Sequence, residues 1–68
     1  DDPRQAARAF ERTLEFASSP QLVEDTLARL AEAYARYDVA SCRRVQAEYL
    51  RKFPGGPHAR GVSKACPP

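Results

Sequence analysis

Three side chains in this 68-residue chain are of types that support nucleophilic or metal chemistry: Cys42, His58 and Cys66. A nucleophilic cysteine needs a base within hydrogen-bond reach, and His58 is the only histidine that could pair with either cysteine. The three residues are 16 and 8 positions apart, and no C-x-x-C or H-x-x-x-H pair brings two metal ligands together. Such residues in a small helical chain more often serve packing and capping. We therefore expect no enzyme activity, no metal and no cofactor.

The elements that must position these residues are all helices. Asp2-Pro3 and Ser19-Pro20 each place a capping side chain before a proline in the first helical position, and Asp38 is a good N-cap for a third helix. Apolar residues follow each start at three- and four-residue spacing, and no strand-like alternation of four or more residues occurs. We expect an all-α fold with helices near residues 3–17, 20–37, 39–53 and 57–66, packed as consecutive antiparallel hairpins.

The stretch "FPGGPHA" at residues 53–59 connects the third and fourth helices. Pro54 disfavours a helical conformation in Phe53, and Pro57 restarts the chain. Gly55 and Gly56 permit the left-handed conformation of a helix C-terminal turn. We expect this turn to set the angle at which the fourth helix packs on the third.

These helices resemble the tetratricopeptide repeat, a pair of antiparallel helices of about 34 residues that stacks into an α-solenoid. The chain departs from the family where Cys42 replaces the usual alanine, where Gln46 replaces a large aromatic residue, and in a short loop between helices that lacks glycine. The residues that match the pattern are Leu27, Leu30, Ala31 and Tyr34 in "LARLAEAY", and the closing pair Phe53-Pro54.

The resemblance implies one domain over residues 1–68, made of the second half of one repeat, a full repeat at 22–54 and a capping helix at 57–66. The "FPGGPHA" turn is similar to turns in repeats of bacterial cell-envelope proteins. The start "DDPRQ" has neither an initiator methionine nor a signal-peptide pattern, so we expect a C-terminal module of a larger bacterial protein. No apolar run approaches the roughly 18 residues that span a bilayer.

In this family the first helices of successive repeats line a concave groove that binds a protein or peptide. The resemblance therefore implies a non-catalytic scaffold or adaptor, with Asp25, Glu32 and Arg36 as candidate partner-binding residues for a polar or basic segment. Ala28 and Ala35 match groove positions too. The alternative for the three charged residues is an ordinary solvated surface. The chain has no asparagine, so we do not expect the Asn–Lys clamp by which some relatives hold a terminal carboxylate.

The charges divide the chain into an acidic first part and a basic second part. Residues 1–38 carry five Arg against eight acidic residues, whereas residues 39–68 carry six basic residues against Glu48 alone. The alternative function is therefore a basic surface for an anionic partner, either nucleic acid or lipid headgroups. We do not expect nucleic acid, because Tyr49 and Phe53 fall on the apolar stripe instead of between base-reading side chains. The residues of this basic surface are Arg43, Arg44, Arg51 and Lys52.

The helix near residues 3–17 lacks the other half of its repeat. Phe10, Leu14 and Phe16 therefore cannot all be covered by the helix near 20–37, and neighbouring repeats or a second copy of the chain would cover the remainder.

The two cysteines indicate a compartment. Cys42 occupies a small inward position on the third helix, and Cys66 follows Val62 by four residues on the inward stripe of the fourth. A disulfide needs Cα atoms within about 7 Å, and Ala59 and Ala65 permit such an approach. We expect a Cys42–Cys66 disulfide, which favours the periplasm or cell envelope. Two buried free cysteines, compatible with the cytoplasm, are the alternative.

Overall fold

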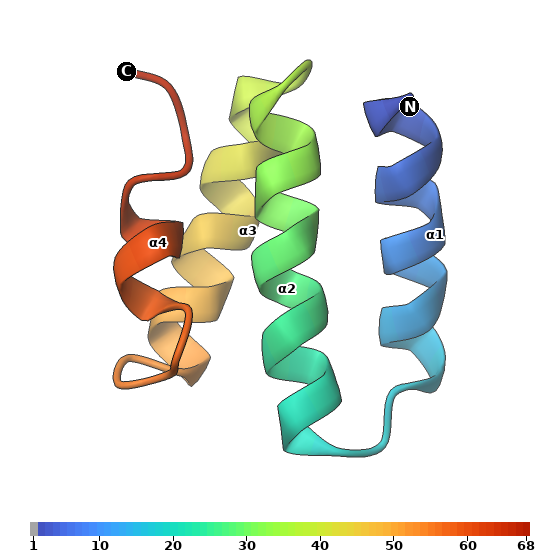
Figure 1. The fold of residues 1–68 in the computed structure, drawn as a ribbon, viewed down its shortest axis with the longest axis vertical. Helices are drawn as coiled ribbons and strands as arrows, with labels where there is room; N and C mark the ends of the chain where they lie inside the picture. The colour runs from blue at the N-terminus through green and yellow to red at the C-terminus, as the bar shows by residue number, and fades with distance from the viewer. Residues whose placement is uncertain (1) are drawn as a thin grey trace.

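The computed structural model describes residues 2–68, and this part of the chain contains four α-helices and no strand. Figure 1 shows the helices, which are α1 (Pro3–Phe16), α2 (Pro20–Ala35), α3 (Val39–Lys52) and α4 (Ala59–Ser63). The expected all-α class with four helices is confirmed. The first three helices end one or two residues before the expected positions.

The starts of α1, α2 and α3 each depend on a capping side chain. The side chains of Asp2, Ser19 and Asp38 accept hydrogen bonds from backbone N–H groups two or three residues later, at 2.9, 3.0 and 3.1 Å. Each bond satisfies one of the donors that the first turn of a helix leaves free. The hydroxyl of Ser41 also donates to Asp38 at 2.7 Å, and the two hydrogen bonds from Ser41 lower the pKa of Asp38.

The expected fourth helix at 57–66 is wrong in its bounds, because α4 contains only five residues. At its end, the N–H groups of Lys64 and Ala65 bond to carbonyls three residues back, as in a tighter turn. Pro67 has no N–H to donate to the Ser63 carbonyl. The Gln46 amide donates to the carbonyls of Val62 and Ser63 instead, at 2.9 and 3.2 Å.

The turn before α4 also differs from the expectation. Neither Gly55 nor Gly56 has a positive φ, so the expected left-handed glycine is wrong. The structure gives Gly56 a different role, because a Cβ atom there would lie 2.6 Å from the Tyr49 hydroxyl and 3.1 Å from Cβ of Phe53. Space, and not backbone conformation, requires glycine at this position.

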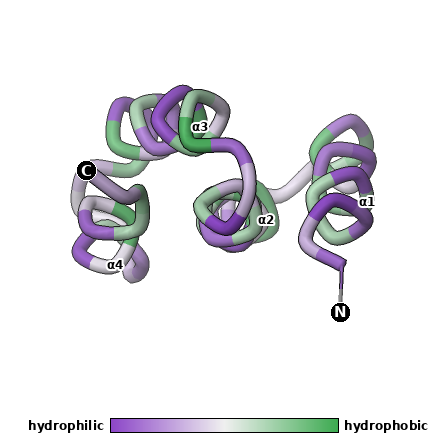
Figure 2. Tube along the Cα trace, turned by 90° about the horizontal axis from the view of Figure 1, so that it is seen from above, coloured by the Kyte–Doolittle hydropathy of each residue, from purple (hydrophilic) through white to green (hydrophobic). Residues whose placement is uncertain are grey.

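The central helix is α2, which packs against each of the other three helices, whereas α1 packs against α2 and reaches α3 through the ion pair between Glu11 and Arg44. Seen from above in Figure 2, α4, α2 and α1 lie in a row, and α3 covers the side between α4 and α2. α1 and α4 therefore lie on opposite sides of α2 in a compact fold. Its core consists mostly of small residues: Ala7, Leu27, Ala28, Leu30, Ala31, Ala33, Cys42, Val45, Tyr49 and Val62.

α1 forms one side of the molecule. Phe10 and Leu14 are partly buried against the core, whereas Phe16 remains 82% exposed. In the part of the chain that the structure describes, no helix is both long and apolar enough to cross a membrane.

Candidate functional site

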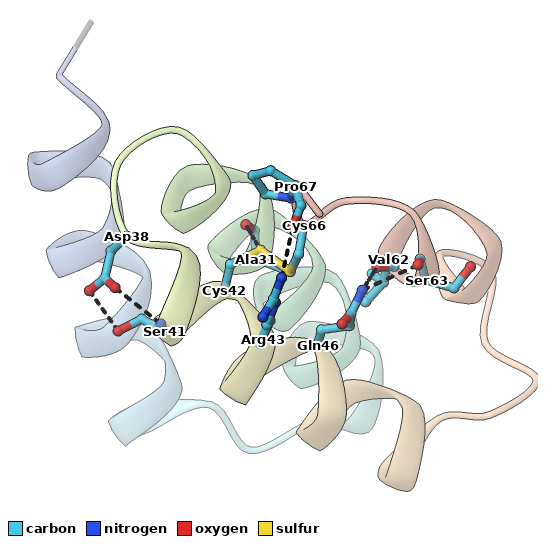
Figure 3. Close-up of a disulfide and its surroundings, with 10 residues drawn as sticks. All are labelled: Ala31, Asp38, Ser41, Cys42, Arg43, Gln46, Val62, Ser63, Cys66 and Pro67. Atoms are coloured by element: carbon cyan, nitrogen blue, oxygen red, sulfur yellow. Dashed lines mark hydrogen bonds between the residues drawn. A yellow bond between two sulfur atoms is a disulfide. The ribbon is translucent and has the colours of Figure 1, made fainter.

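A disulfide between Cys42 of α3 and Cys66 fixes the C-terminal segment, as Figure 3 shows. The two Cα atoms are 5.8 Å apart, and the Cys42 side chain is completely buried, 3.3 Å from the Ala31 carbonyl. Arg43 donates to the Pro67 carbonyl at 3.3 Å on the same side of α3. The expected pair is therefore formed. It engages both thiols, so neither cysteine pairs with His58, and residues 2–68 contain no group of three metal-binding side chains.

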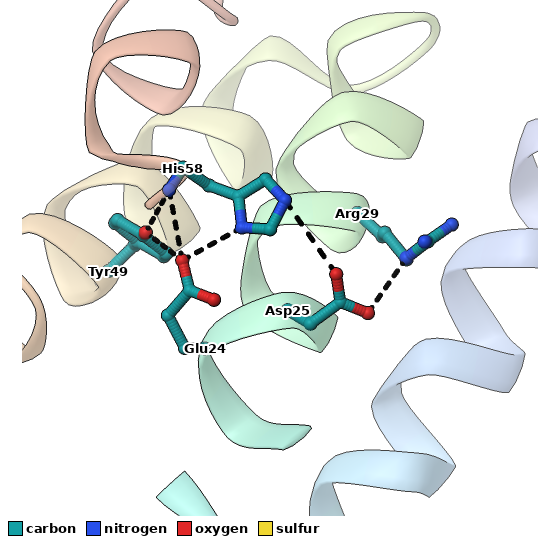
Figure 4. A network of polar contacts seen from close by, with 5 residues as sticks. All are labelled: Glu24, Asp25, Arg29, Tyr49 and His58. Carbon is teal, nitrogen blue, oxygen red and sulfur yellow. Dashed lines mark hydrogen bonds and ion pairs between the residues drawn. The ribbon is translucent and has the colours of Figure 1, made fainter. Parts of the chain in front are cut away.

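A second site joins three residues far apart in the sequence, Glu24, Tyr49 and His58 (Figure 4). They come from the first half of α2, the last turn of α3 and the turn before α4. Glu24 is 6% exposed and Tyr49 is completely buried. The Glu24 Oε2 atom accepts hydrogen bonds from the Tyr49 hydroxyl and, at 3.1 Å, from the His58 backbone N–H. Nδ1 of His58 lies 2.8 Å from the same oxygen, and opposite a carboxylate this nitrogen carries the proton.

The electrostatics of the site keep Glu24 charged and Tyr49 protonated at neutral pH. Burial alone would raise the pKa of Glu24, but the hydrogen bonds from Tyr49 and His58 together outweigh it and lower the pKa below the ordinary 4.5. Burial and the hydrogen bond to Glu24 raise the pKa of Tyr49 to about 12. The site is thus a buried negative charge held by hydrogen-bond donors from Tyr49 and His58.

The network extends to the surface of α2 through the imidazole. Nε2 of His58 lies 3.7 Å from Asp25 Oδ1, and Asp25 Oδ2 accepts from Arg29 Nε at 2.9 Å. Asp25 and Arg29 are exposed enough that their ion pair contributes little to stability. His58 therefore lies between two carboxylates.

A pocket of about 210 Å³ adjoins this network at one end of the molecule. It lies where the start of α2, the end of α3 and the following turn meet. Its lining residues are Pro20, Gln21, Glu24, Phe53, Gly56 and Pro57.

The residues predicted to face a groove differ in their surroundings. Asp25 is partly exposed and paired with Arg29, whereas Glu32 and Arg36 are exposed. Ala28 is only 1% exposed and packs in the core, so its expected groove position is wrong; Ala35 is partly buried. Asp25 and Arg36 share a face of α2 but lie about 16 Å apart along its axis, so the structure does not bring them into one compact site.

Three of the four residues of the basic surface have partners within the chain. Arg43 binds the Pro67 carbonyl, Arg44 lies 3.7 Å from Glu11, and Lys52 pairs with Glu48 at 3.0 Å. Arg51 is exposed. Arg43 and Lys52 are nine residues apart and thus point to roughly opposite sides of α3, with Arg44 and Arg51 between them around the helix.

The sequence contained one signal for the missed Glu24. This residue precedes Leu27, Ala28 and Ala31 by three, four and seven positions, which places a carboxylate on the buried stripe of a helix. A buried carboxylate requires hydrogen-bond donors, but nothing in the local pattern identifies Tyr49 and His58 as those donors. Comparison with known proteins gives no family assignment: no family model, no curated protein and no solved structure matches this chain.

Proposed function

We propose that the chain is a non-catalytic protein-interaction scaffold, built from helical hairpins of the tetratricopeptide type and forming the C-terminal part of a repeat array in a larger bacterial protein. The observation that carries the proposal is the open arrangement of the helices. α1 packs on α2 and touches α3 at the ion pair between Glu11 and Arg44, and Phe16 at its end is 82% exposed. An array of this kind buries its faces only when neighbouring repeats stack on it.

The packing of α4 supports the same proposal. α4 packs against both α2 and α3, as the first helix of a following repeat packs on both helices of the preceding one. The face of α2 that carries Asp25, Glu32 and Arg36 is the groove surface in this arrangement. Its two carboxylates favour a polar or basic peptide segment as the partner.

The disulfide is compatible with an oxidising compartment. We place the scaffold in the periplasm or cell envelope for that reason. The C-terminal segment of a protein exposed to that compartment gains from the cross-link, because α4 has only five residues to hold it in place.

The test is a binding measurement with the full-length parent protein and a partner that is first captured, then identified and purified. The double variant Glu32→Lys/Arg36→Glu inverts two groove charges and should weaken binding at least about tenfold. The matched variant Arg43→Gln/Arg51→Gln changes two exposed charges on α3 and should have little effect. Binding should fall only modestly between about 50 and 200 mM salt.

The alternative, a basic surface for nucleic acid or lipid headgroups, gives the opposite pattern. Binding would then be lost in Arg43→Gln/Arg51→Gln, retained in the groove variant, and reduced by orders of magnitude over the same salt range. That pattern, or a partner whose binding ignores both variants, would refute the scaffold proposal.

A further inference from the structure

The pocket beside the Glu24 network has the size of a site for one side chain. Its volume of about 210 Å³ is below the roughly 300–1,000 Å³ of pockets that hold whole small molecules or cofactors. Pro20, Phe53 and Pro57 give it apolar walls, and Glu24 is its one charged lining residue within residues 2–68. The ligand must therefore be small and mostly apolar, with one group that suits a carboxylate.

The Glu24 carboxylate has one oxygen free for that ligand. All three hydrogen bonds to Glu24 reach Oε2, and Figure 4 shows the other oxygen without a partner among the residues drawn. Within residues 2–68, no fully buried side-chain nitrogen or oxygen lacks a hydrogen bond. Oε1 must therefore remain accessible, although the side chain as a whole is only 8% exposed.

The negative charge of the Glu24 carboxylate determines which chemical group the pocket can bind. The donors on Oε2 keep Glu24 ionised, so an anionic group would be repelled. A wholly apolar group would cover a charged oxygen without giving it a hydrogen bond, which is costly. A cation on an apolar stem satisfies both parts of the pocket, because the charge meets Oε1 and the stem covers the apolar walls.

The single free oxygen distinguishes between the two common cationic side chains. A guanidinium group binds a carboxylate best through two parallel hydrogen bonds, which need both oxygens. Because Oε2 already accepts from Tyr49 and His58, only a one-point contact is available. A compact ammonium group makes such a contact without loss.

We infer that this pocket binds the side chain of a lysine from a partner protein, with the ammonium group at Oε1 of Glu24 and the methylene stem against Phe53. The site goes beyond the proposed groove, since its residues belong to the first turns of α2 and the turn after α3. Glu32 lies in the last turn of α2 and Arg36 is its C-cap residue, so the two sites are separable by mutation.

The experiment is a titration of the isotope-labelled chain with N-acetyl-lysine methylamide, followed by the backbone amide shifts of Gln21 and Gly56. N-acetyl-norleucine methylamide has the same stem without the ammonium group and is the matched probe. The lysine probe should give saturable shifts at these amides, and the norleucine probe should bind at least about tenfold more weakly. Equal binding of the two probes, or the absence of saturable shifts with the lysine probe, would refute the inference.

Two sets of variants assign the binding to Glu24. Glu24→Gln should weaken the lysine probe at least about tenfold, whereas Asp25→Asn removes the neighbouring charge and should change it by less than about twofold. Because Glu24→Gln alters a buried network and could unfold the chain, exposed Gln21 provides an independent series at the rim. Gln21→Glu should tighten and Gln21→Lys should weaken the probe, each about two- to fivefold.

The two Gln21 variants and the groove variant Glu32→Lys/Arg36→Glu complete the design. If Gln21→Glu and Gln21→Lys leave the affinity unchanged, or if Asp25→Asn weakens the probe as much as Glu24→Gln, the cation is not held in this pocket. Glu32→Lys/Arg36→Glu should leave the probe's affinity unchanged, so failure of the lysine site and failure of the proposed groove give different results.

Discussion

The hydroxyl of Tyr49 makes two hydrogen bonds in a place that solvent does not reach, donating to Glu24 and accepting from the His58 N–H at 3.0 Å. Tyr49→Phe removes both bonds and leaves a buried carboxylate with fewer donors. We expect the free energy of unfolding, measured with urea, to fall by about 1–3 kcal/mol.

The matched control for this change is Tyr34→Phe. The Tyr34 hydroxyl donates to Glu11 at 2.7 Å, and this bond raises the pKa of Tyr34 to about 12, but both side chains are partly exposed. Water replaces the lost partner there, so a loss of only about 0.5–1 kcal/mol is expected. Equal losses in the two variants would show that the buried hydrogen bonds of Tyr49 stabilise the fold no more than the partly exposed bond of Tyr34.

The same network makes stability depend on pH in a definite direction. Because the pKa of Glu24 is lower in the folded chain than its unfolded value of 4.5, its contribution is fully present above that pH and is lost as pH falls through the folded pKa. We expect the unfolding free energy to decrease from neutral pH to about pH 3, and the decrease to be smaller in Glu24→Gln. An identical decrease in both proteins would contradict this assignment.

At high pH the unfolding free energy depends on pH in the opposite direction, because the group that titrates is Tyr49. The pKa of Tyr49 is raised from 10.0 to about 12, so its contribution is fully present below pH 10 and is lost as pH rises through about 12.

The sequence predicted single-residue roles correctly where they depend only on neighbouring residues in the chain. The caps Asp2, Ser19 and Asp38 each need only the two or three residues that follow, so the sequence pattern is sufficient to predict them. Glu24 and His58 are 34 residues apart, and their contact depends on how α2, α3 and the turn meet in three dimensions. No periodicity within one helix contains that information.

At the scale of elements, the turn at 53–58 places His58 against Glu24, and Gly56 makes this approach possible. In Gly56→Ala the new Cβ would meet the Tyr49 hydroxyl at 2.6 Å and the Phe53 carbonyl oxygen at 3.2 Å, so the turn must shift. We expect a loss of about 1–3 kcal/mol in urea unfolding. Gly55→Ala is the control, because nothing lies within 4 Å of a Cβ there. A loss as large as that of Gly56→Ala would mean that backbone conformation, not space, requires the glycines.

The disulfide holds the short α4 and the C-terminal segment against α3. The cross-linked cysteines are 24 residues apart, and closing a loop of this length stabilises a chain by about 3 kcal/mol in the chain-entropy estimate. Cys66→Ala leaves Cys42 in the core and should lower the unfolding free energy by that amount. Reduction of the wild-type chain should give the same loss.

Mass spectrometry of the unreduced, alkylated protein provides the control for this prediction. Two alkylated thiols would show that the bond is absent, and the argument for an oxidising compartment would be lost with it. The pattern of small inward residues was enough to pair these cysteines. It was not enough to bound α4, whose end depends on the contact between Gln46 and the carbonyls of Val62 and Ser63.

At the scale of the whole molecule, the helices on the two sides of α2 are held with different strength. α4 is tied to α3 by the disulfide, and α2 contains seven buried residues, whereas α1 has only Ala7. The order of the helices could be predicted from the chain, because short connections make neighbours pack together. That α1 packs on α2 and meets α3 at the ion pair between Glu11 and Arg44 could not be predicted, since it depends on the angle between the helices.

This asymmetry predicts that the molecule opens from α1. In native-state hydrogen exchange, the amides of α1 should exchange before those of α2 and α3, because few buried contacts oppose the opening of this helix. Leu14→Ala, at a side chain packed partly against the core, should accelerate exchange in α1 and leave α3 unchanged. Phe16→Ala should have little effect, since that side chain is 82% exposed. Addition of a preceding helical hairpin should slow exchange in α1 if the proposed repeat array continues there. Equal exchange rates in all helices would instead show that the four helices unfold as one cooperative unit, and the prediction would be wrong.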